Sequence, residues 1–448
     1  MNLKISRILH AGYTFQTEKS FIAFDPLFEN LFSVNCFAYP AIEFNFDQIK
    51  KLKLDAVFIS HYHDDHCSLE SLNYLDKKTP IYMYTVFDEF IHLIKDLGFT
   101  HVYPLKLNES VVIGDITVIP WPALDRDVDS IFQIKVGGLN ILNIVDSWID
   151  ADTLEKLEKN KPWDLILQPF QTMREIEVLS PSRFQPADRN IPIEWIQQLQ
   201  QLKPKYIIPS SCQFIFEPWS WYRDFYFPIS YKNFEIEIKQ ALPESKVIKL
   251  NPSESIQLGL QVIEKTFPLP WVKTVGETDV DYNYNPDRVI PSTQEISKNF
   301  QAISVDQFQD VINYCKIDLI KKYKTLQLVD DGYFNKPQVW QLSLFDHLGC
   351  ETQLQYQIFK NEIHLVENKI NKITWLAEIS VFKLYSAVKN AESLSSLYIR
   401  INDIRFNDEI EELLQNADLL EDPLIRCLYE GSIATYQKQQ LKKIQSGI

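Results

Sequence analysis

Three histidines and two aspartates lie within six residues of the chain, in the segment His61-Tyr62-His63-Asp64-Asp65-His66. Imidazole nitrogens and carboxylate oxygens are ligands that suit zinc, iron and manganese. Two such groups at adjacent subsites could hold a pair of metal ions, which generates hydroxide near neutral pH. The alternative is a polar loop that happens to be rich in histidine. The pattern HxHxDH therefore predicts a metal site.

Asp55–Ser60, directly before the motif, has the composition of a buried strand. At the end of such a strand the side chains of the motif can converge on one point. Upstream, residues 2–25 alternate apolar and polar side chains between turn residues, which predicts a meander of short strands. Downstream, helices are expected at Ser68–Leu75 and Val86–Leu97, with a strand at Ile81–Thr85 between them. Alternating strands and helices predict sheets covered by helices.

The same alternation continues to about residue 260. The expected elements are strands at Ser110–Ile119, Ile131–Val136, Leu139–Val145 and Tyr206–Pro209, and a helix at Ile193–Gln201. Gly137-Gly138, between the second and third of these strands, is a two-residue hairpin signal.

The length of 448 residues favours two domains. We expect a metal-binding domain at 1–265 and a linker at 266–300, where Pro, Asn, Asp and Thr are frequent. A smaller α+β domain should follow at 301–448. Its expected elements are a helix at Val305–Tyr323, strands near 338–345 and 352–366, a helix near 378–391, a strand near 396–403, and helices to the end.

The charge of the chain limits its partners. It has 45 basic and 60 acidic residues, a formal net charge of -15, which argues against nucleic acid as a general partner. No apolar run reaches the ~20 residues that span a bilayer, and no signal core follows the first residues, so we expect no membrane insertion and a cytoplasmic location. The six cysteines form no CxxC pair, which favours reduced thiols.

The HxHxDH segment, preceded by His10-Ala11-Gly12 and Phe24-Asp25-Pro26, resembles the metallo-β-lactamase superfamily over about residues 3–260. More narrowly, the chain is similar to the corresponding region of CMP-N-acetylneuraminate hydroxylase and its relatives. Three segments carry this similarity, Ile59–His66, Ile141–Asp146 and Pro204–Pro209. The resemblance implies an α/β (α+β) fold, a four-layer αββα sandwich with the metals at one edge of its sheets.

The resemblance also implies roles for individual residues. His61 and His63 would bind one metal ion, Asp65 and His66 a second, and Asp146 would bridge both, which makes Asp65 and His66 the expected catalytic residues. Asp25 would orient the motif from outside the ligand set, as ligating histidines commonly require, and His10 is expected beside it. Ordinary turn, cap and surface roles are the alternatives for Asp25, Asp146 and His10.

Two departures from the superfamily pattern bear on the metals. Before the bridging aspartate the superfamily commonly has a histidine, where this chain has Trp121–Asp127, so that Asp125 or Asp127 could substitute. A last histidine usually follows the late strand, but Ser210-Ser211-Cys212 stands there, and Cys212 is either a ligand or a small buried thiol. Fewer imidazoles favour a single metal, an oxygen-rich pair, or iron. One or two divalent ions are expected, zinc or iron, with manganese also suited.

The carboxy-terminal segments Trp375-Leu376-Ala377 and Leu397–Ile401 weakly resemble the tail of the same hydroxylase group and, more distantly, sterol-carrier-like α+β domains. We expect this domain to pack against or cover a substrate.

Three functions remain open. The first is a hydrolase in which metal-activated water attacks an ester, phosphoester or amide of a small molecule. The second is an iron-dependent oxygenase related to the hydroxylase. Because the chain has no Cys-x-His pair for a Rieske cluster, that enzyme would need electrons from a separate protein. The third is a non-catalytic binding protein with a degenerate site.

Overall fold

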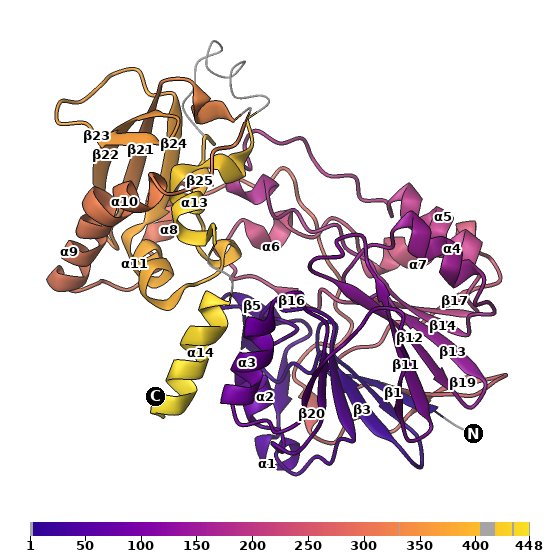
Figure 1. Cartoon of the computed structure of the whole chain (residues 1–448). Coiled ribbons are helices and arrows are strands. Elements are labelled where there is room, and N and C mark those ends of the chain that lie inside the picture. The colour runs from indigo at the N-terminus through magenta and orange to yellow at the C-terminus, as the bar shows by residue number, and fades with distance from the viewer. Residues whose placement is uncertain (1–2, 331, 404–416, 432–433, 448) are drawn as a thin grey trace.

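The computed structural model describes residues 3–330, 332–403, 417–431 and 434–447. Figure 1 shows two lobes, an amino-terminal lobe coloured indigo to magenta and a carboxy-terminal lobe coloured orange to yellow. The last helix, α14 (Thr435–Ser446), reaches back from the second lobe and packs on α2 (Leu69–Asn73) and α3 (Asp88–Asp96) of the first. Within the described ranges, no helix has the length and apolar character needed to cross a membrane.

An eight-stranded sheet forms one half of the amino-terminal lobe. Its strands are β1 (Leu3–Arg7), β2 (Tyr13–Gln16), β3 (Phe21–Phe24), β7 (Ala56–Ile59), β8 (Ile81–Met83), β9 (Val102–Pro104), β18 (Ser255–Leu258) and β19 (Ile263–Thr266). They lie in the order β19-β18-β1-β2-β3-β7-β8-β9. The antiparallel pairs β1–β2 and β2–β3 confirm the predicted meander. The pairs β3–β7, β7–β8 and β8–β9 are parallel, so the carboxyl ends of these strands share one edge.

A seven-stranded sheet forms the other half, with its strands in chain order. They are β10 (Val111–Ile113), β11 (Ile116–Pro122), β12 (Ser130–Val136), β13 (Leu139–Asn143), β14 (Leu165–Pro169), β15 (Tyr206–Ser210) and β17 (Lys246–Val247). The predicted hairpin is confirmed: β12 and β13 pair antiparallel around Gly137 and Gly138, whose φ angles of 55° and 83° suit glycine. From β13 to β17 the pairing is parallel.

The two sheets pack face to face. A buried apolar cluster fills the space between them, and the rings of Phe24 on β3 and Phe132 on β12 lie 5.0 Å apart there. A second cluster joins the outer faces of the sheets to helices. These helices are α2 and α3 for the first sheet, and α4 (Ala151–Glu158), α5 (Ile193–Leu202) and α7 (Tyr231–Ala241) for the second. The lobe is therefore a four-layer αββα sandwich, as the resemblance implied.

Short elements complete the amino-terminal lobe. They are β4 (Leu31–Phe32), β5 (Cys36–Ala38) and β16 (Phe214–Ile215) in one small sheet, β6 (Ile42–Phe44) and β20 (Val272–Thr274) in another, and the helices α1 (Phe46–Ile49) and α6 (Tyr222–Phe225).

The carboxy-terminal lobe has one five-stranded sheet with its own buried core. The strands are β21 (Gln338–Phe345), β22 (Glu351–Phe359), β23 (Glu362–Leu365), β24 (Trp375–Ser380) and β25 (Arg400–Ile401), in the order β23-β22-β21-β24-β25. Its helices are α8 (Thr293–Ser297), α9 (Val305–Asn313), α10 (Leu319–Tyr323), α11 (Val381–Asn390) and α13 (Pro423–Tyr429). In the segment 266–300, β20 pairs with β6 of the first lobe, and α8 packs on β24 of the second.

The structure corrects three element predictions in this lobe. The helix expected at Val305–Tyr323 is interrupted by a π-helical stretch at Tyr314–Asp318. The helix expected near 378 begins only at Val381, because β24 uses the preceding residues, all buried, in a parallel pair with β21. The strand expected near 396–403 is reduced to the two residues of β25, since a 3₁₀ turn occupies Leu394–Ser396. Residues 404–416 lie outside the described part.

Asp422 caps the amino terminus of α13 and also binds the buried Trp375, so its removal should destabilise the second lobe. Its buried carboxylate accepts hydrogen bonds from the backbone of Leu424 at 2.8 Å and from Trp375 Nε1 at 2.7 Å. Losing a cap costs about 1 kcal/mol, and a buried N–H without a partner costs about 1–3 kcal/mol. We expect Asp422→Ala to lower the free energy of unfolding by about 2 to 3 kcal/mol in urea titrations followed by circular dichroism.

The exposed Asp418 is a matched control, because it caps only the short turn Leu419–Glu421. Asp418→Ala should cost less than about 1 kcal/mol. Equal losses in the two variants would contradict the role given to the buried carboxylate.

Candidate metal centre

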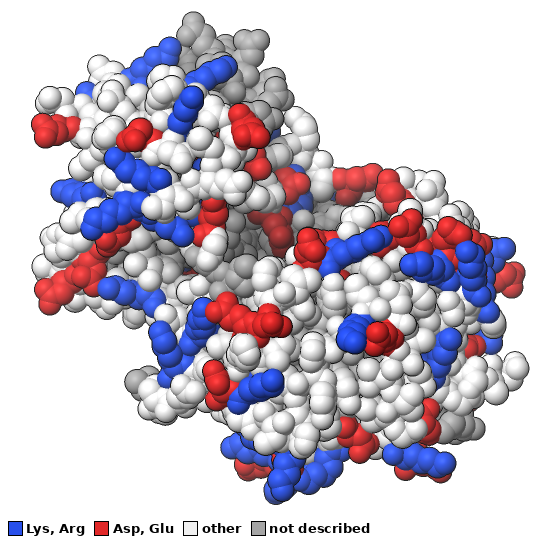
Figure 2. Space-filling view, in the orientation of Figure 1, with Lys and Arg blue, Asp and Glu red and all other residues white. Residues whose placement is uncertain are grey.

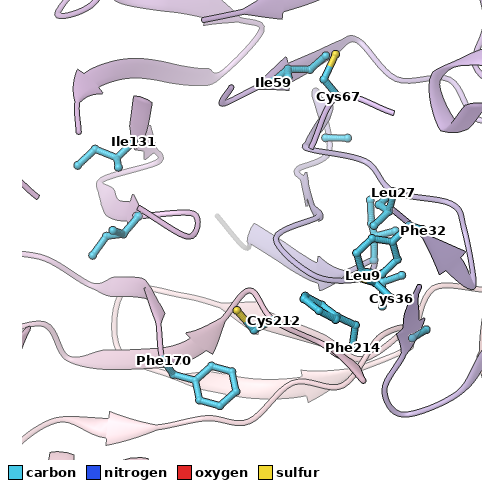
Figure 3. Close-up of a cluster of buried hydrophobic side chains, with 14 of the residues drawn as sticks. Leu9, Leu27, Phe32, Cys36, Ile59, Cys67, Ile131, Phe170, Cys212 and Phe214 are labelled. Atoms are coloured by element: carbon cyan, nitrogen blue, oxygen red, sulfur yellow. The ribbon is translucent and has the colours of Figure 1, made fainter. Parts of the chain in front are cut away.

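The HxHxDH motif forms a loop, residues 60–66, at the carboxyl end of β7. Asp25 follows β3, the parallel neighbour of β7, so the two strand ends bring it to the start of this loop. The buried Asp25 carboxylate accepts hydrogen bonds from the Ser60 backbone N–H at 2.8 Å and from Ser60 Oγ at 2.7 Å. Ile59 and Cys67, on either side of the loop, are buried next to one another in the apolar cluster (Figure 3). Both ends of the loop are therefore anchored.

Four potential ligand atoms converge beside this loop. One atom each from His10, Asp65, His66 and Asp146 lie within 4.8 Å of one another, and we call these residues the His–Asp cluster. His66 Nε2 lies 3.0 Å from Asp146 Oδ2, and His10 Nε2 lies 3.2 Å from Asp65 Oδ2. The other carboxylate oxygen of Asp146, Oδ1, is buried without a hydrogen-bond partner. A buried carboxylate oxygen without a partner is costly unless it binds a cation, so the cluster fits a metal ion.

His61 and His63 form a second group beside the cluster. His61 Nε2 lies 3.0 Å from His63 Nδ1, and the His61 ring lies 4.0 Å from the ring of His66, centroid to centroid. Asp129 contributes a carboxylate, with Oδ1 3.6 Å from His61 Nδ1. The five ligands implied by the resemblance, His61, His63, Asp65, His66 and Asp146, are therefore neighbours.

Whether His66 and His10 can bind a metal through Nε2 depends on whether Nδ1, the other ring nitrogen, donates or accepts a hydrogen bond. His66 Nδ1 lies 3.1 Å from Asp25 Oδ2 and donates to this carboxylate, so in the neutral, metal-binding form of the ring the lone pair is at Nε2, on the side of the cluster. His10 is different, because its Nδ1 accepts the backbone N–H of Cys212 at 2.9 Å. A neutral His10 ring then carries its proton at Nε2, where it donates to Asp65. These contacts favour His10 as a residue that positions Asp65 rather than as a ligand.

Backbone strain gathers at the centre. His10, Asp25, Val145, Ser211 and Cys212 all have φ angles between 40° and 65°, a region that side chains with a Cβ rarely adopt. His10 belongs to the His–Asp cluster, and Val145 precedes Asp146 in the chain. Asp25 contacts His66, and Cys212, which follows Ser211, contacts His10. Strain of this kind persists only where the surrounding structure enforces it, and it is common at functional sites.

Burial and nearby charges give the three histidines of the motif different protonation states. Burial and the nearby His66 lower the pKa of His61 to about 4. Burial and His61 likewise lower the pKa of His63 to about 4. Burial also acts against protonation of His66, but Asp146 and Asp65 outweigh it and hold its pKa well above the usual value. His61 and His63 are thus neutral at pH 7, the form of imidazole that binds metal ions.

A cavity of about 530 Å³ opens onto the centre. His61, His63 and three carboxylates of the centre face it. The remaining lining includes Ser33, Cys36, Asp64, Met173, Glu175, Ile176, Phe214, Phe216 and Tyr226 from the first lobe, and Ser393, Leu394, Ser395 and Leu420 from the second. The second lobe therefore forms part of the wall.

The structure does not bring Asp125 or Asp127, the aspartates expected to replace the missing histidine, to the centre. Asp125 and Asp127 are exposed, and the Asp125 carboxylate accepts the backbone N–H of Asp127 at 3.2 Å. A tight turn, in which the Asp129 N–H donates to the Asp125 carbonyl at 2.8 Å, instead carries Asp129 to the centre. Cys212 is buried and supports His10 through its backbone, while burial raises the pKa of its thiol and keeps it protonated.

Outside the HxHxDH motif, two carboxylates of the cavity, Asp129 and Glu175, are absent from the set of site residues expected from the sequence. Asp129 precedes β12 and stands four residues after Asp125, so the acid-rich segment 125–129 was the available signal. Glu175 lies in a long loop after β14, where no pattern distinguishes it from other surface acids.

No family model matches the chain, and no curated protein does. Among solved structures it is similar to Igni18, a metallo hydrolase from Ignicoccus hospitalis KIN4/I, with 17% identity over 58% of this chain and all of the other, at a TM-score of 0.41. It is similar to the metallo-β-lactamase fold protein YhfI from Bacillus subtilis, with 15% identity over 57% of this chain and 99% of the other, at a TM-score of 0.39.

A third similar structure is CmlA, a diiron β-hydroxylase from Streptomyces venezuelae, with 14% identity, a TM-score of 0.40, and 58% of this chain matched to 54% of the other. None of these three is a CMP-N-acetylneuraminate hydroxylase, so that narrower resemblance stays a prediction. The chain itself is a mixed α/β protein whose first lobe is an αββα sandwich, with imidazoles and carboxylates gathered at the shared edge of its sheets.

Proposed function

We propose that this protein is a metal-dependent hydrolase acting on a small molecule held in the cavity between its lobes. One observation carries the proposal: the nitrogen and oxygen atoms of the His–Asp cluster lie within 4.8 Å of one another, its two carboxylates line a cavity of about 530 Å³, and Asp146 Oδ1 is buried there without a partner. Such pockets, with convergent polar groups, are the usual form of small-molecule sites.

Two metal positions fit the donor atoms. His61 and His63 would hold one ion, Asp65 and His66 the other, and Asp146 would bridge both. Bound divalent ions supply an activated water and stabilise negative charge that develops on the substrate. Zinc and manganese suit these nitrogen and oxygen donors.

The residues around the ligands keep them in place. Asp25 accepts from His66 Nδ1 and aims its Nε2 at the cluster, and His10 donates to Asp65. The second lobe contributes Leu394 and Leu420 to the cavity wall, where they exclude water from a bound substrate. Asp65 and His66 are thus held in fixed orientations, and fixed orientation of the reacting groups lowers the barrier of a reaction.

The same centre supports a second candidate, an iron-dependent oxygenase. Asp65, Asp129 and Asp146 make the donor set rich in oxygen, which suits iron as well as zinc. This enzyme would take electrons from a separate protein, and it is distinguished from the hydrolase by its metal and its need for O₂.

Elemental analysis of the protein purified without added metal tests both functions. We expect about two equivalents of zinc or manganese per chain, at least one of which is lost in the double variant His61→Ala, His63→Ala. The variant His92→Ala is the control, because His92 is exposed on α3. Hydrolysis of chromogenic esters, phosphodiesters and amides should follow the metal content.

Other outcomes are equally informative. Stoichiometric iron, with turnover that requires O₂ and a reductant, would move the assignment to the oxygenase. A protein that holds no metal and takes up none on reconstitution would contradict both enzymes and leave a binding protein.

A further inference from the structure

The carboxy-terminal helix α14 carries a buried polar face that is turned to the motif loop. Gln437 and Gln440, three residues apart and therefore on one side of the helix, are only 6% and 4% exposed. The outer side of the helix is basic, with Lys442 and Lys443 exposed, and Figure 2 shows basic side chains on this surface. A surface helix normally buries apolar residues, because a buried amide is costly unless it is hydrogen-bonded. The two glutamines are therefore expected to have specific partners in the first lobe.

The partner of Gln437 lies between two expected metal ligands. Gln437 Nε2 donates to the backbone carbonyl of Tyr62 at 2.8 Å. Tyr62 stands between His61 and His63 in the chain, and the facing nitrogens of these two rings, Nε2 of His61 and Nδ1 of His63, lie 3.0 Å apart. The amide of Gln437 thus holds the peptide group that joins Tyr62 to His63.

This contact adds to the anchors that the first lobe provides for the loop. Those anchors lie at its two ends, in the hydrogen bonds of Ser60 and the burial of Cys67. The bond from Gln437 reaches the middle of the loop from a helix 375 residues away in sequence. Gln440 extends the contact past the loop, since its Oε1 accepts from the backbone N–H of Leu69 at 3.3 Å. Because α14 reaches back from the second lobe, that lobe takes part in holding the loop.

We infer that Gln437 is a positioning residue of the metal centre, through which α14 keeps His61 and His63 close enough to share one metal ion. The inference rests on the proposed function and adds to it a dependence of the metal site on the second lobe. Metal sites lose about 10- to 100-fold in affinity when a side chain that orients a ligand is removed. Gln437 acts on the backbone rather than on an imidazole, so the lower end of this range is expected.

Two glutamines of the same helix provide a matched test in the full-length protein. Gln437→Met keeps the length of the side chain and removes its donor. Gln445→Met is the control, because Gln445 is exposed and its Nε2 lies 3.5 Å from the carbonyl of Asp96, at the end of α3 rather than on the motif loop. Resident metal is removed, and Co²⁺ is added as the probe in competition with a chromophoric chelator. Gln437→Met should bind Co²⁺ about tenfold more weakly than the unchanged protein, with an altered visible spectrum, whereas Gln445→Met should stay within twofold with the spectrum unaltered.

A second measurement does not depend on metal. Amide hydrogen exchange, followed by mass spectrometry of peptides that cover residues 60–69 in the metal-free proteins, should be faster in Gln437→Met and unchanged in Gln445→Met. Faster exchange with the same Co²⁺ affinity and spectrum would show a contact that only stabilises the fold, and would overturn the inference. Equal effects of the two variants, or no change in exchange, would overturn it as well.

The two measurements separate this inference from the proposed function. Tight Co²⁺ binding that Gln437→Met retains would overturn the inference and leave the hydrolase in place. An unchanged protein that binds no Co²⁺ would contradict the hydrolase, while faster exchange in Gln437→Met alone would still support the hold of α14 on the loop.

Discussion

The variant Asp146→Asn should bind its metal at least 100-fold more weakly than the unchanged protein. Asp146 Oδ2 lies 3.0 Å from His66 Nε2, and its other oxygen, Oδ1, is buried without a partner. An amide keeps the shape of the side chain but loses its charge and half of its acceptor oxygens. Loss of supporting partners alone costs metal sites about 10- to 100-fold in affinity, so loss of a central ligand should cost more.

Competition with a chromophoric chelator measures this affinity. Asp125→Asn is the matched control, because Asp125 is an exposed aspartate that is not in the His–Asp cluster. Its affinity should stay within twofold of the unchanged protein. If the two variants bind the metal equally tightly, Asp146 is not a ligand and does not bridge two metal ions.

The second large effect concerns stability. Arg7 is fully buried at the end of β1, and its guanidinium donates to the backbone carbonyls of His10, Pro209, Leu250 and Ser211 at 2.8 to 3.3 Å. Arg7→Met would leave these four carbonyls without this donor. Each buried group that loses its partner costs about 1–3 kcal/mol, partly offset because a charge is no longer buried. We expect the free energy of unfolding to fall by about 4 kcal/mol.

Urea unfolding of the two purified proteins measures this difference. Arg126→Met provides the comparison, since Arg126 is half-exposed and its partner Asp150 keeps two hydrogen bonds to Thr153 without it. It should cost less than about 1 kcal/mol. Because Arg7 also holds the turn of His10 and Ser211, the metal affinity of Arg7→Met should fall as well. A change in stability below about 1 kcal/mol would show that solvent replaces the guanidinium at little cost.

The parts of the site that follow from local sequence were predictable. His61, His63, Asp65 and His66 occupy one short loop after a strand, and the motif itself brings them together. Asp146 follows a hydrophobic strand in the second sheet, and parallel strand ends in such folds meet at one edge. For these residues the pattern of strands and the residue types were sufficient.

The remaining parts depend on contacts between distant segments. The orientation of His10 is set by the backbone of Cys212, 202 residues away in sequence. Asp129 rather than Asp125 reaches the centre because of the hydrogen bonds of one turn, which composition does not reveal. The contribution of Leu394 and Leu420 to the cavity depends on how the two lobes pack. In the second lobe, the end of β24 was mistaken for the start of a helix because a short, largely apolar run fits either element.

The return of α14 to the first lobe has a consequence for synthesis. Gln437 Nε2 donates to the carbonyl of Tyr62, within the motif loop, at 2.8 Å across 375 residues of sequence, and Gln440 accepts from the Leu69 backbone at 3.3 Å. A ribosome has made every expected metal ligand once residue 146 has been added. The motif loop acquires its contact with α14 only after residue 437 has been added as well. Segments made early already anchor both ends of the motif loop, but the loop lacks this contact from α14 for most of its translation.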